Sequence, residues 1–119
     1  MKKILVVDDE REILEMTRKR LERSGYKVLT ASDGKEGIKK TVEEKPDLIL
    51  LDIVMPDMDG FTMLRKLKGH SSTSLIPVIM LSAKGECDSL LKGEDFGALD
   101  YFIKPFDWQE LLKYIKKYV

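Results

Sequence analysis

Four short apolar runs in the 119-residue chain each end in a residue that can bind metal or phosphate. Apolar runs of this length, separated by helical patterns, are typical of strands in a parallel sheet that is buried on both faces. In open sheets of this kind, ligands bind at the carboxyl ends of the strands. We therefore expect the polar residues to converge on one pocket. The runs and their end residues are Ile4–Val7 with Asp8 and Asp9, Leu48–Leu51 with Asp52, Val78–Leu81 with Ser82, and Tyr101–Ile103 with Lys104.

Helical patterns and one more alternating strand fill the space between these runs. The strand–helix alternation repeats five times, and right-handed crossovers then place helices on both faces of the sheet. The fold class is therefore predicted to be α/β. The other predicted elements are a strand over Lys27–Ala31 and helices over Arg11–Arg23 (apolar face Leu14, Thr17, Leu21), Lys35–Lys45 (Ile38 and Val42, with an outer Glu36–Lys40 pair), after Gly60 (Phe61, Leu64, Leu67), near Glu86–Phe96, and after Asp107 (Leu111, Leu112, Ile115, Val119).

The helices differ in how well the sequence specifies them. Asp107 is a predicted N-cap, with Glu110 three residues on as in a capping box. The segment Glu86–Phe96 is the least specified, because Gly93 lies inside it and glycine costs a helix about 1 kcal/mol relative to alanine. A weak helix is expected to be a movable element that phosphate can bias.

Composition excludes several classes of protein. The 21 basic and 21 acidic residues cancel, so no basic field for nucleic acid exists. The single cysteine, Cys87, rules out an internal disulfide and fits a reducing compartment. No apolar stretch approaches the roughly 20 residues of a membrane span, and Met1 to Ile4 leave no room for a signal peptide. We expect one cytoplasmic domain over residues 1–119, with no direct nucleic-acid binding.

The charge of the predicted pocket points to a divalent cation. Asp8, Asp9 and Asp52 contribute −3 and Lys104 returns +1, so −2 remains to be neutralised. One Mg²⁺ cancels that charge, and Mg²⁺ favours carboxylate, water and phosphate oxygens. Zinc does not fit, because no histidine or cysteine ends these strands. We expect Mg²⁺ as the cofactor, with Mn²⁺ as a possible substitute.

The same pocket suits phosphoryl transfer. Asp52 stands alone after its strand, and a carboxylate beside Mg²⁺ can attack phosphorus to give an aspartyl phosphate. Lys104 and the Ser82 hydroxyl would meet the charge on the transferring oxygens. Taken singly, each of these residues is more often structural, for example as a helix cap. It is their occurrence at four strand ends that indicates a site.

With these residues in place, the sequence resembles the receiver domain of two-component response regulators. The resemblance covers the whole chain. It implies a flavodoxin-like (βα)5 fold, a doubly wound parallel five-stranded sheet of order 2-1-3-4-5. The matching segments are Ile4–Glu10, Leu51–Gly60, Leu81–Lys84 and Gly97–Phe106.

The resemblance also implies roles for single residues. Asp52 is expected to be the phosphoacceptor, which takes its phosphoryl group from the phosphohistidine of a histidine kinase or phosphotransfer protein. Asp9, Asp52 and the Val54 carbonyl are expected to bind Mg²⁺, with Asp8 acting through water. The remaining roles are the switch hydroxyl of Ser82, the switch aromatic Tyr101, the phosphate-binding Lys104, and a cis bond before Pro105.

Two flanking positions bear on how long the phosphoryl group stays. Val54 offers no side-chain hydrogen bond to orient an attacking water, and Lys84 carries no carboxylate to accept its proton. We therefore expect slow self-dephosphorylation. The alternative is that both positions are ordinary surface.

Partner-binding residues are expected on two surfaces. Ile13 and Met16 lie off the buried stripe of the first helix and suggest a kinase docking patch, with core packing as the alternative. Pro105 and Phe106 are also expected to contact partners. Tyr101, Tyr114, Tyr118 and Trp108, with the lysines at 113, 116 and 117, form either an output face or semi-exposed packing.

The preferred interpretation is a receiver without an output domain, a monomer or a weak phosphorylation-dependent dimer. It would bind a downstream protein, as chemotaxis receivers do, or pass phosphate on. The segment Gly97–Asp107 is similar to that of the sporulation phosphorelay receiver, and the two options stay open. We expect a self-phosphorylating switch, not a turnover enzyme. A phosphatase of the haloacid dehalogenase kind would need a second acid two residues after the nucleophile, where Val54 stands, and a flavodoxin would need a Ser/Thr/Gly-rich phosphate loop after its first strand.

Overall fold

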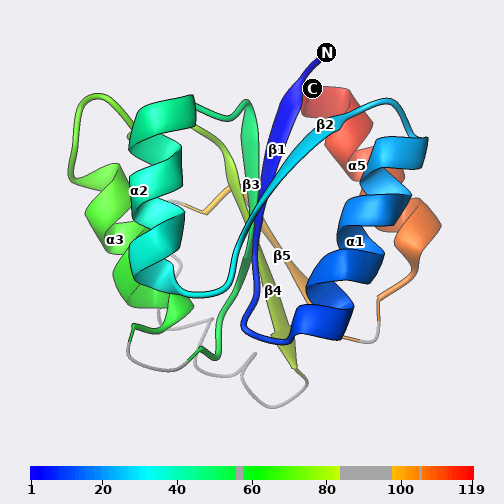
Figure 1. Ribbon diagram of the computed structural model, residues 1–119, viewed down its shortest axis with the longest axis horizontal. Coiled ribbons are helices and arrows are strands. Elements are labelled where there is room, and N and C mark those ends of the chain that lie inside the picture. The colour runs from blue at the N-terminus through cyan, green and yellow to red at the C-terminus, as the bar shows by residue number, and fades with distance from the viewer. Residues whose placement is uncertain (56–57, 84–97, 105) are drawn as a thin grey trace.

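A computed structural model describes residues 1–55, 58–83, 98–104 and 106–119. The strands form one parallel sheet in the order β2-β1-β3-β4-β5, which confirms the predicted topology. Helices α2 and α3 cover one face, and α1 and α5 cover the other (Figure 1). The elements are β1 (Lys3–Val7), α1 (Arg11–Arg23), β2 (Lys27–Ala31), α2 (Gly34–Glu44), β3 (Leu48–Asp52), α3 (Gly60–Lys68), β4 (Val78–Ala83), β5 (Asp100–Lys104) and α5 (Trp108–Tyr118).

The central strands are apolar because both of their faces are covered. All five residues of β3 are buried, whereas the edge strand β2 is mostly half-buried or exposed. Side chains alternate across the sheet, so Leu5 and Val7 of β1 join the core under α2 and α3. Ile4 and Val6 join the core under α1 and α5. The alternation explains why these runs show no polar face in the sequence.

Helix α1 has the predicted bounds and the predicted buried face. Leu14, Thr17 and Leu21 are its buried residues. On the outer face, the Arg18 guanidinium lies 2.7 Å from Glu15 and 2.8 Å from Glu22. These exposed pairs lie three and four residues apart, the spacing at which helix side chains meet.

Helix α2 departs from its predicted face. Its buried residues are Gly34, Gly37 and Thr41, whereas Val42 is 50% exposed. The glycines let the helix approach its neighbours closely, and the Thr41 hydroxyl donates to the Gly37 carbonyl at 2.7 Å. Ile38 is half-buried and packs against the core under α2 and α3, as predicted, so the predicted face is wrong at Val42 and lacked the buried glycines and Thr41. The predicted outer pair is confirmed, with Glu36 and Lys40 3.5 Å apart.

Aspartate side chains cap the amino ends of α3 and α5. Asp59 accepts from the Thr62 amide at 2.8 Å. Asp107 accepts at 2.8 Å from the Gln109 amide, one residue before the Glu110 of the predicted capping box. Helix α3 buries Met63 beside the predicted Leu64 and Leu67.

Two further predictions concern the helix near Glu86–Phe96 and membrane-spanning segments. The predicted helix near Glu86–Phe96 lies outside the described residues. Within the described ranges, no helix is long and apolar enough to cross a membrane.

Candidate functional site

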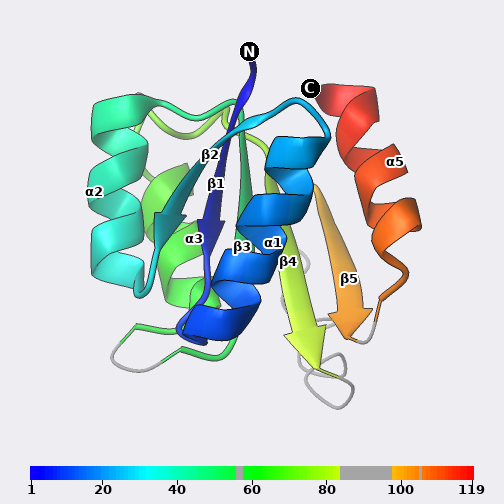
Figure 2. The ribbon, with the colours of Figure 1, turned by 45° about the vertical axis from the view of Figure 1, so that its right-hand side comes forward.

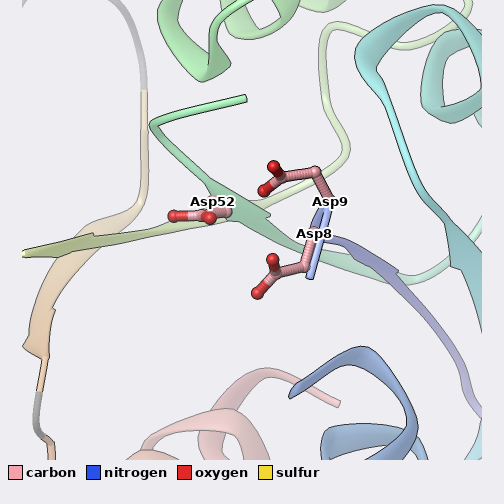
Figure 3. A group of neighbouring side chains, drawn as sticks. All are labelled: Asp8, Asp9 and Asp52. Atoms are coloured by element: carbon pink, nitrogen blue, oxygen red, sulfur yellow. The ribbon is translucent and has the colours of Figure 1, made fainter. Parts of the chain in front are cut away.

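Three carboxylates gather at the carboxyl edge of the sheet, as the sequence predicted. Asp8 and Asp9 follow β1 and Asp52 ends β3, the neighbouring strand (Figure 3). One carboxylate oxygen from each lies within 4.8 Å of the others. Asp8 is 3% exposed and Asp52 is 5% exposed, whereas Asp9 is exposed. Among the described residues, this is the group of acidic side chains that can share a metal ion.

The backbone around Asp8 sets the direction of its carboxylate. Its amide donates to the Ala31 carbonyl of β2 at 3.1 Å, which extends the sheet pairing by one residue. Its side chain accepts from the Glu10 amide at 2.9 Å, at the point where the chain turns into α1. Asp8 therefore links the end of β1 to the start of α1 while it remains part of the acidic group.

The connection after Asp52 depends on a close backbone approach. The Gly60 amide donates to the Ile53 carbonyl at 2.7 Å. A Cβ atom on Gly60 would lie 2.5 Å from the Asp52 carbonyl oxygen and 2.8 Å from the Ile53 Cα. Both atoms belong to the backbone and cannot move aside, so only glycine fits. The sequence marked this segment as a turn, but it gave no sign that Gly60 supports Asp52 directly.

The site fits a hard divalent cation. Two of the three carboxylates are buried, and their like charges lie close together in a position where water screens them poorly. All the donors in the group are oxygens, which Mg²⁺ favours. Carboxylates at this spacing are disfavoured as a bare cluster and favoured around a cation.

For the predicted site residues Ser82 and Lys104, the structure describes the backbone only. In the backbone, Leu81 of β4 pairs with Asp52 and Ser82 pairs with Ile103, so Ser82 stands one residue beyond the level of Asp52. Lys104 is the last residue of β5. The side chains of Ser82 and Lys104 lie outside the described part of the structure, as do Lys84 and Pro105.

Two further predicted residues lie near this edge. Val54 is 59% exposed, two residues after Asp52. Tyr101 is half-buried and packs against the core under α2 and α3. The switch role of Tyr101 is left as a prediction.

Helices α1 and α5 run side by side in the ribbon views (Figure 2), and their side chains line a groove. Its volume is about 360 Å³. Ile13 is half-buried and Met16 is 51% exposed, so Met16 is not a core residue. The groove also includes Leu81, the residue that pairs with Asp52 in the sheet. The lining residues are Ile13, Met16, Thr17, Arg20, Leu81, Phe106 and Trp108.

Two of these lining residues, Arg20 and Trp108, were missed as groove residues from the sequence. The Arg20 guanidinium lies 5.5 Å from the centre of the Trp108 ring, a distance typical of cation–π contacts. Phe106 stacks beside Trp108 with ring centres 6.3 Å apart. No sequence signal pairs an arginine with a tryptophan 88 positions later (108 − 20), because the crossing of α1 and α5 is a tertiary feature.

The candidate output face is divided by the sheet. Trp108 and Tyr114 pack against the core under α1 and α5, whereas Tyr101 packs against the opposite core. Tyr114 and Tyr118 lie 5.2 Å apart between ring centres. Burial, together with hydrogen bonds between the Tyr114 hydroxyl and the side chains of Tyr118 and Asp100, of which the Asp100 carboxylate accepts, raises the pKa of Tyr114 far above its usual value. Trp108 therefore belongs to the groove and not to a common face with Tyr101.

Comparison with known proteins places the chain among relatives of two lengths. It is 46% identical over 97% of its length to the alkaline phosphatase synthesis transcriptional regulatory protein PhoP of Bacillus subtilis, of which it covers 47%. It is 41% identical over 97% of its length to protein PilH of Pseudomonas aeruginosa, of which it covers 95%. The chain thus spans about half the length of some curated relatives and nearly all of another.

The fold and the family model agree with these relatives. The structure matches the Vibrio cholerae chemotaxis protein CheY4 with a TM-score of 0.91 and 33% sequence identity, over 100% of this chain and 99% of that one. The model of the response regulator receiver domain matches residues 4–116. The chain, with its acidic group at the ends of β1 and β3, is a member of the response regulator receiver domain family.

Proposed function

We propose that Asp52 accepts a phosphoryl group from the phosphohistidine of a histidine kinase or phosphotransfer protein, in a reaction that requires Mg²⁺. The observation that carries this proposal is the group of three carboxylates, one oxygen from each within 4.8 Å, in a receiver-family fold. Asp52 is the member of the group on a central strand. Its burial next to two other acids suits a nucleophile that works beside a cation.

The chain's own residues have separate tasks in this reaction. Asp9, Asp52 and the Val54 carbonyl would hold the cation, with Asp8 acting through water. An Asp52 oxygen forms a bond to phosphorus as the bond from phosphorus to the donor imidazole nitrogen breaks. Lys104 and Ser82 would bind the phosphoryl oxygens, and Ser82 and Tyr101 would report their arrival. Bound Mg²⁺ supplies positive charge where the transferring oxygens become most negative.

Phosphotransfer from a panel of histidine kinases and phosphotransfer proteins tests this function. We expect labelling by the cognate donor only when Mg²⁺ or Mn²⁺ is present, and no labelling of Asp52→Asn. The label should reach one phosphoryl group per chain. In a separate assay, the protein should not turn over phosphomonoesters. Steady turnover would instead favour a phosphatase, and labelling of Asp52→Asn would assign the acceptor to another residue.

We further propose that the groove between α1 and α5 receives the phosphodonor protein. Exposed Met16, half-buried Ile13 and Phe106 offer apolar surface beside the strand end that carries Ser82; Pro105 is included in this docking surface by its position in the sequence. We expect Ile13→Ala with Met16→Ala to slow phosphotransfer by about 10-fold, the effect of losing about 1.4 kcal/mol of binding. Lys19→Ala on the exposed face of α1 is the matched control. Unchanged transfer in the double variant would contradict docking here.

The phosphoryl group is proposed to persist. Val54 is 59% exposed and apolar, so its side chain cannot orient a water for attack on the phosphoryl group. We expect Val54→Asn to shorten the lifetime of the aspartyl phosphate severalfold, as measured by loss of label from the purified protein. A lifetime of seconds in the unmodified protein would contradict slow self-dephosphorylation.

The output is proposed to be the binding of a downstream protein or the relay of phosphate. The receiver is proposed to act as a single domain of residues 1–119 in the cytoplasm. It is proposed to be a monomer, or a weak dimer when phosphorylated. Similarity to PilH over 95% of that protein supports this. Relatives twice as long support an attached output domain instead. Incubation of the phosphorylated protein with phosphotransfer proteins separates relay, in which label moves to histidine, from binding without transfer.

A further inference from the structure

The start of α2 lies against the segment that follows Asp52 in the chain. Asp33 caps α2 by accepting from the Glu36 amide at 2.7 Å, which determines where the helix begins. Gly34 is the first residue of the helix and is buried. A Cβ atom placed on Gly34 would lie 2.8 Å from the sulfur of Met58 and 3.1 Å from both the Cβ and the Cγ of Met58.

Crowding by these atoms cannot be relieved by the Met58 side chain alone. The sulfur can swing away, because methionine has several rotatable bonds. The Met58 Cβ, however, is bound directly to the backbone and moves only if the backbone moves. A side chain at position 34 would therefore displace residue 58 or tilt the start of α2 by a few tenths of an ångström. The buried glycine keeps this contact close.

A displacement of Met58 reaches Asp52 through two residues of backbone. Asp59 follows Met58 and caps α3 through the Thr62 amide. Gly60 comes next, and its Cα lies so near the Asp52 carbonyl that a Cβ there would come within 2.5 Å of the oxygen. The Gly60 amide also donates to the Ile53 carbonyl at 2.7 Å. The segment from Met58 to Gly60 is thus held by α2 on one side and by the end of β3 on the other.

We propose that the contact between Gly34 and Met58 positions Asp52 for metal binding, so that α2 controls the affinity of the acidic group for Mg²⁺. Gly34 and Met58 are positioning residues, because neither belongs to the acidic group itself. This inference rests on the proposed function, since it needs a cation at Asp8, Asp9 and Asp52. It gives α2 a role at a site to which it contributes no ligand.

Calorimetric titration with MgCl₂ tests the inference without any phosphodonor. We expect Gly34→Ala to weaken Mg²⁺ binding by about 10-fold, the lower end of what disturbed supporting residues cost a metal site. Gly34→Ala combined with Met58→Gly should recover part of the loss, because this second substitution removes all three crowded atoms, the Cβ included. Gly69→Ala is the matched control, since its new Cβ would meet only the Arg65 and Lys66 carbonyls, at 3.4 and 3.6 Å.

Urea unfolding without Mg²⁺ measures the free energy of unfolding of each variant. It separates a loss of Mg²⁺ affinity caused by positioning from one caused by a general loss of stability. A Gly34→Ala protein that binds Mg²⁺ as the unmodified protein does would overturn the inference, whatever its stability. Equal weakening in Gly34→Ala and in the double variant would also overturn it, because the loss would then not pass through Met58. If the unmodified protein itself fails to bind Mg²⁺, the proposed function falls, and the inference with it.

Discussion

The two ends of the sheet use charged residues in opposite ways. At the carboxyl end, β1 and β3 bring three acidic side chains together, with two of them buried (Figure 3). At the amino end, side chains of opposite charge or polarity connect neighbouring elements. Both ends belong to the same strands, so the fold does not dictate either arrangement. The side chains that the sequence supplies at each end make the difference.

The amino end is held by side-chain bonds to the backbone. The Lys3 amide donates to the Asp47 carboxylate at 2.8 Å, and the Lys3 ammonium donates to the Glu44 carbonyl at 2.7 Å. These bonds join the start of β1 to the end of α2 and to the residue before β3. Each bond satisfies a polar group at an exposed or part-buried position. A typical hydrogen bond contributes about 0.5–1.5 kcal/mol to the free energy of unfolding.

The loop between α3 and β4 is closed in the same manner. The Lys68 ammonium donates to the carbonyls of Ser74 at 2.9 Å and Ile76 at 2.7 Å. The buried Thr73 hydroxyl donates to the Leu67 carbonyl at 2.5 Å. The comparison teaches that polar side chains pair with the backbone at the amino end of the sheet, whereas like charges gather at the carboxyl end, where the proposed cation would bind.

Removal of a carboxylate at the carboxyl end of the sheet should have the largest effect, and it should raise the free energy of unfolding, whereas most substitutions lower it. We expect Asp52→Asn to abolish phosphorylation and to raise the free energy of unfolding without Mg²⁺ by about 1–4 kcal/mol, the range of the Coulomb energy of two charges about 4 Å apart between a water-like dielectric and that of a protein surface. Phosphotransfer assays and urea unfolding measure the two effects. A less stable Asp52→Asn protein would show that its carboxylate serves the fold as well.

Removal of a carboxylate at the amino end should have the opposite sign. We expect Asp47→Ala to lower the free energy of unfolding by about 1–3 kcal/mol, because the part-buried Lys3 amide loses its acceptor. Mg²⁺ affinity should stay the same, since Asp47 lies at the other end of β3. Urea unfolding with and without Mg²⁺ checks both statements, and a stabilised variant would break the comparison.

A smaller loss is expected at Thr73, whose hydroxyl is buried. Thr73→Val keeps the shape and removes the donor, so we expect about 1 kcal/mol less stability. Thr62→Val provides a matched control, because its amide and not its hydroxyl takes part in the described cap. Equal effects at the two positions would mean that the bond from Thr73 to Leu67 contributes nothing specific.

The smallest effect concerns the pH dependence of Lys68. Burial lowers the pKa of Lys68 below its usual 10.5, so the unfolded chain binds this proton more tightly than the folded one. The stability contributed by Lys68 is therefore complete above the unfolded pKa and falls as pH falls through the folded pKa. We expect the advantage of the unmodified protein over Lys68→Met to grow between pH 7 and pH 10, as measured by urea unfolding at each pH. An advantage that shrinks would contradict the sign.

The spacing of apolar residues and the positions of capping and turn residues in the sequence determined most of the fold. The bounds of α1, its buried Leu14, Thr17 and Leu21, and the Asp107 cap followed from local rules of helix geometry. The acidic group was also predictable, because parallel strands that run in the same direction must bring their carboxyl ends to one edge. Strand direction placed Asp8, Asp9 and Asp52 at one edge of the sheet, and the strand order implied by the family resemblance placed β1 beside β3.

Only the tertiary structure decided which surfaces pack against one another. The fully buried residues of α2 are Gly34, Gly37 and Thr41, with Ile38 half-buried beside them and Val42 exposed, because close packing there favours small residues. The Arg20–Trp108 contact and the contact of Gly34 with Met58 join segments that share no local pattern. Local sequence encodes the period and ends of an element, whereas contacts between elements depend on how whole faces fit together in space.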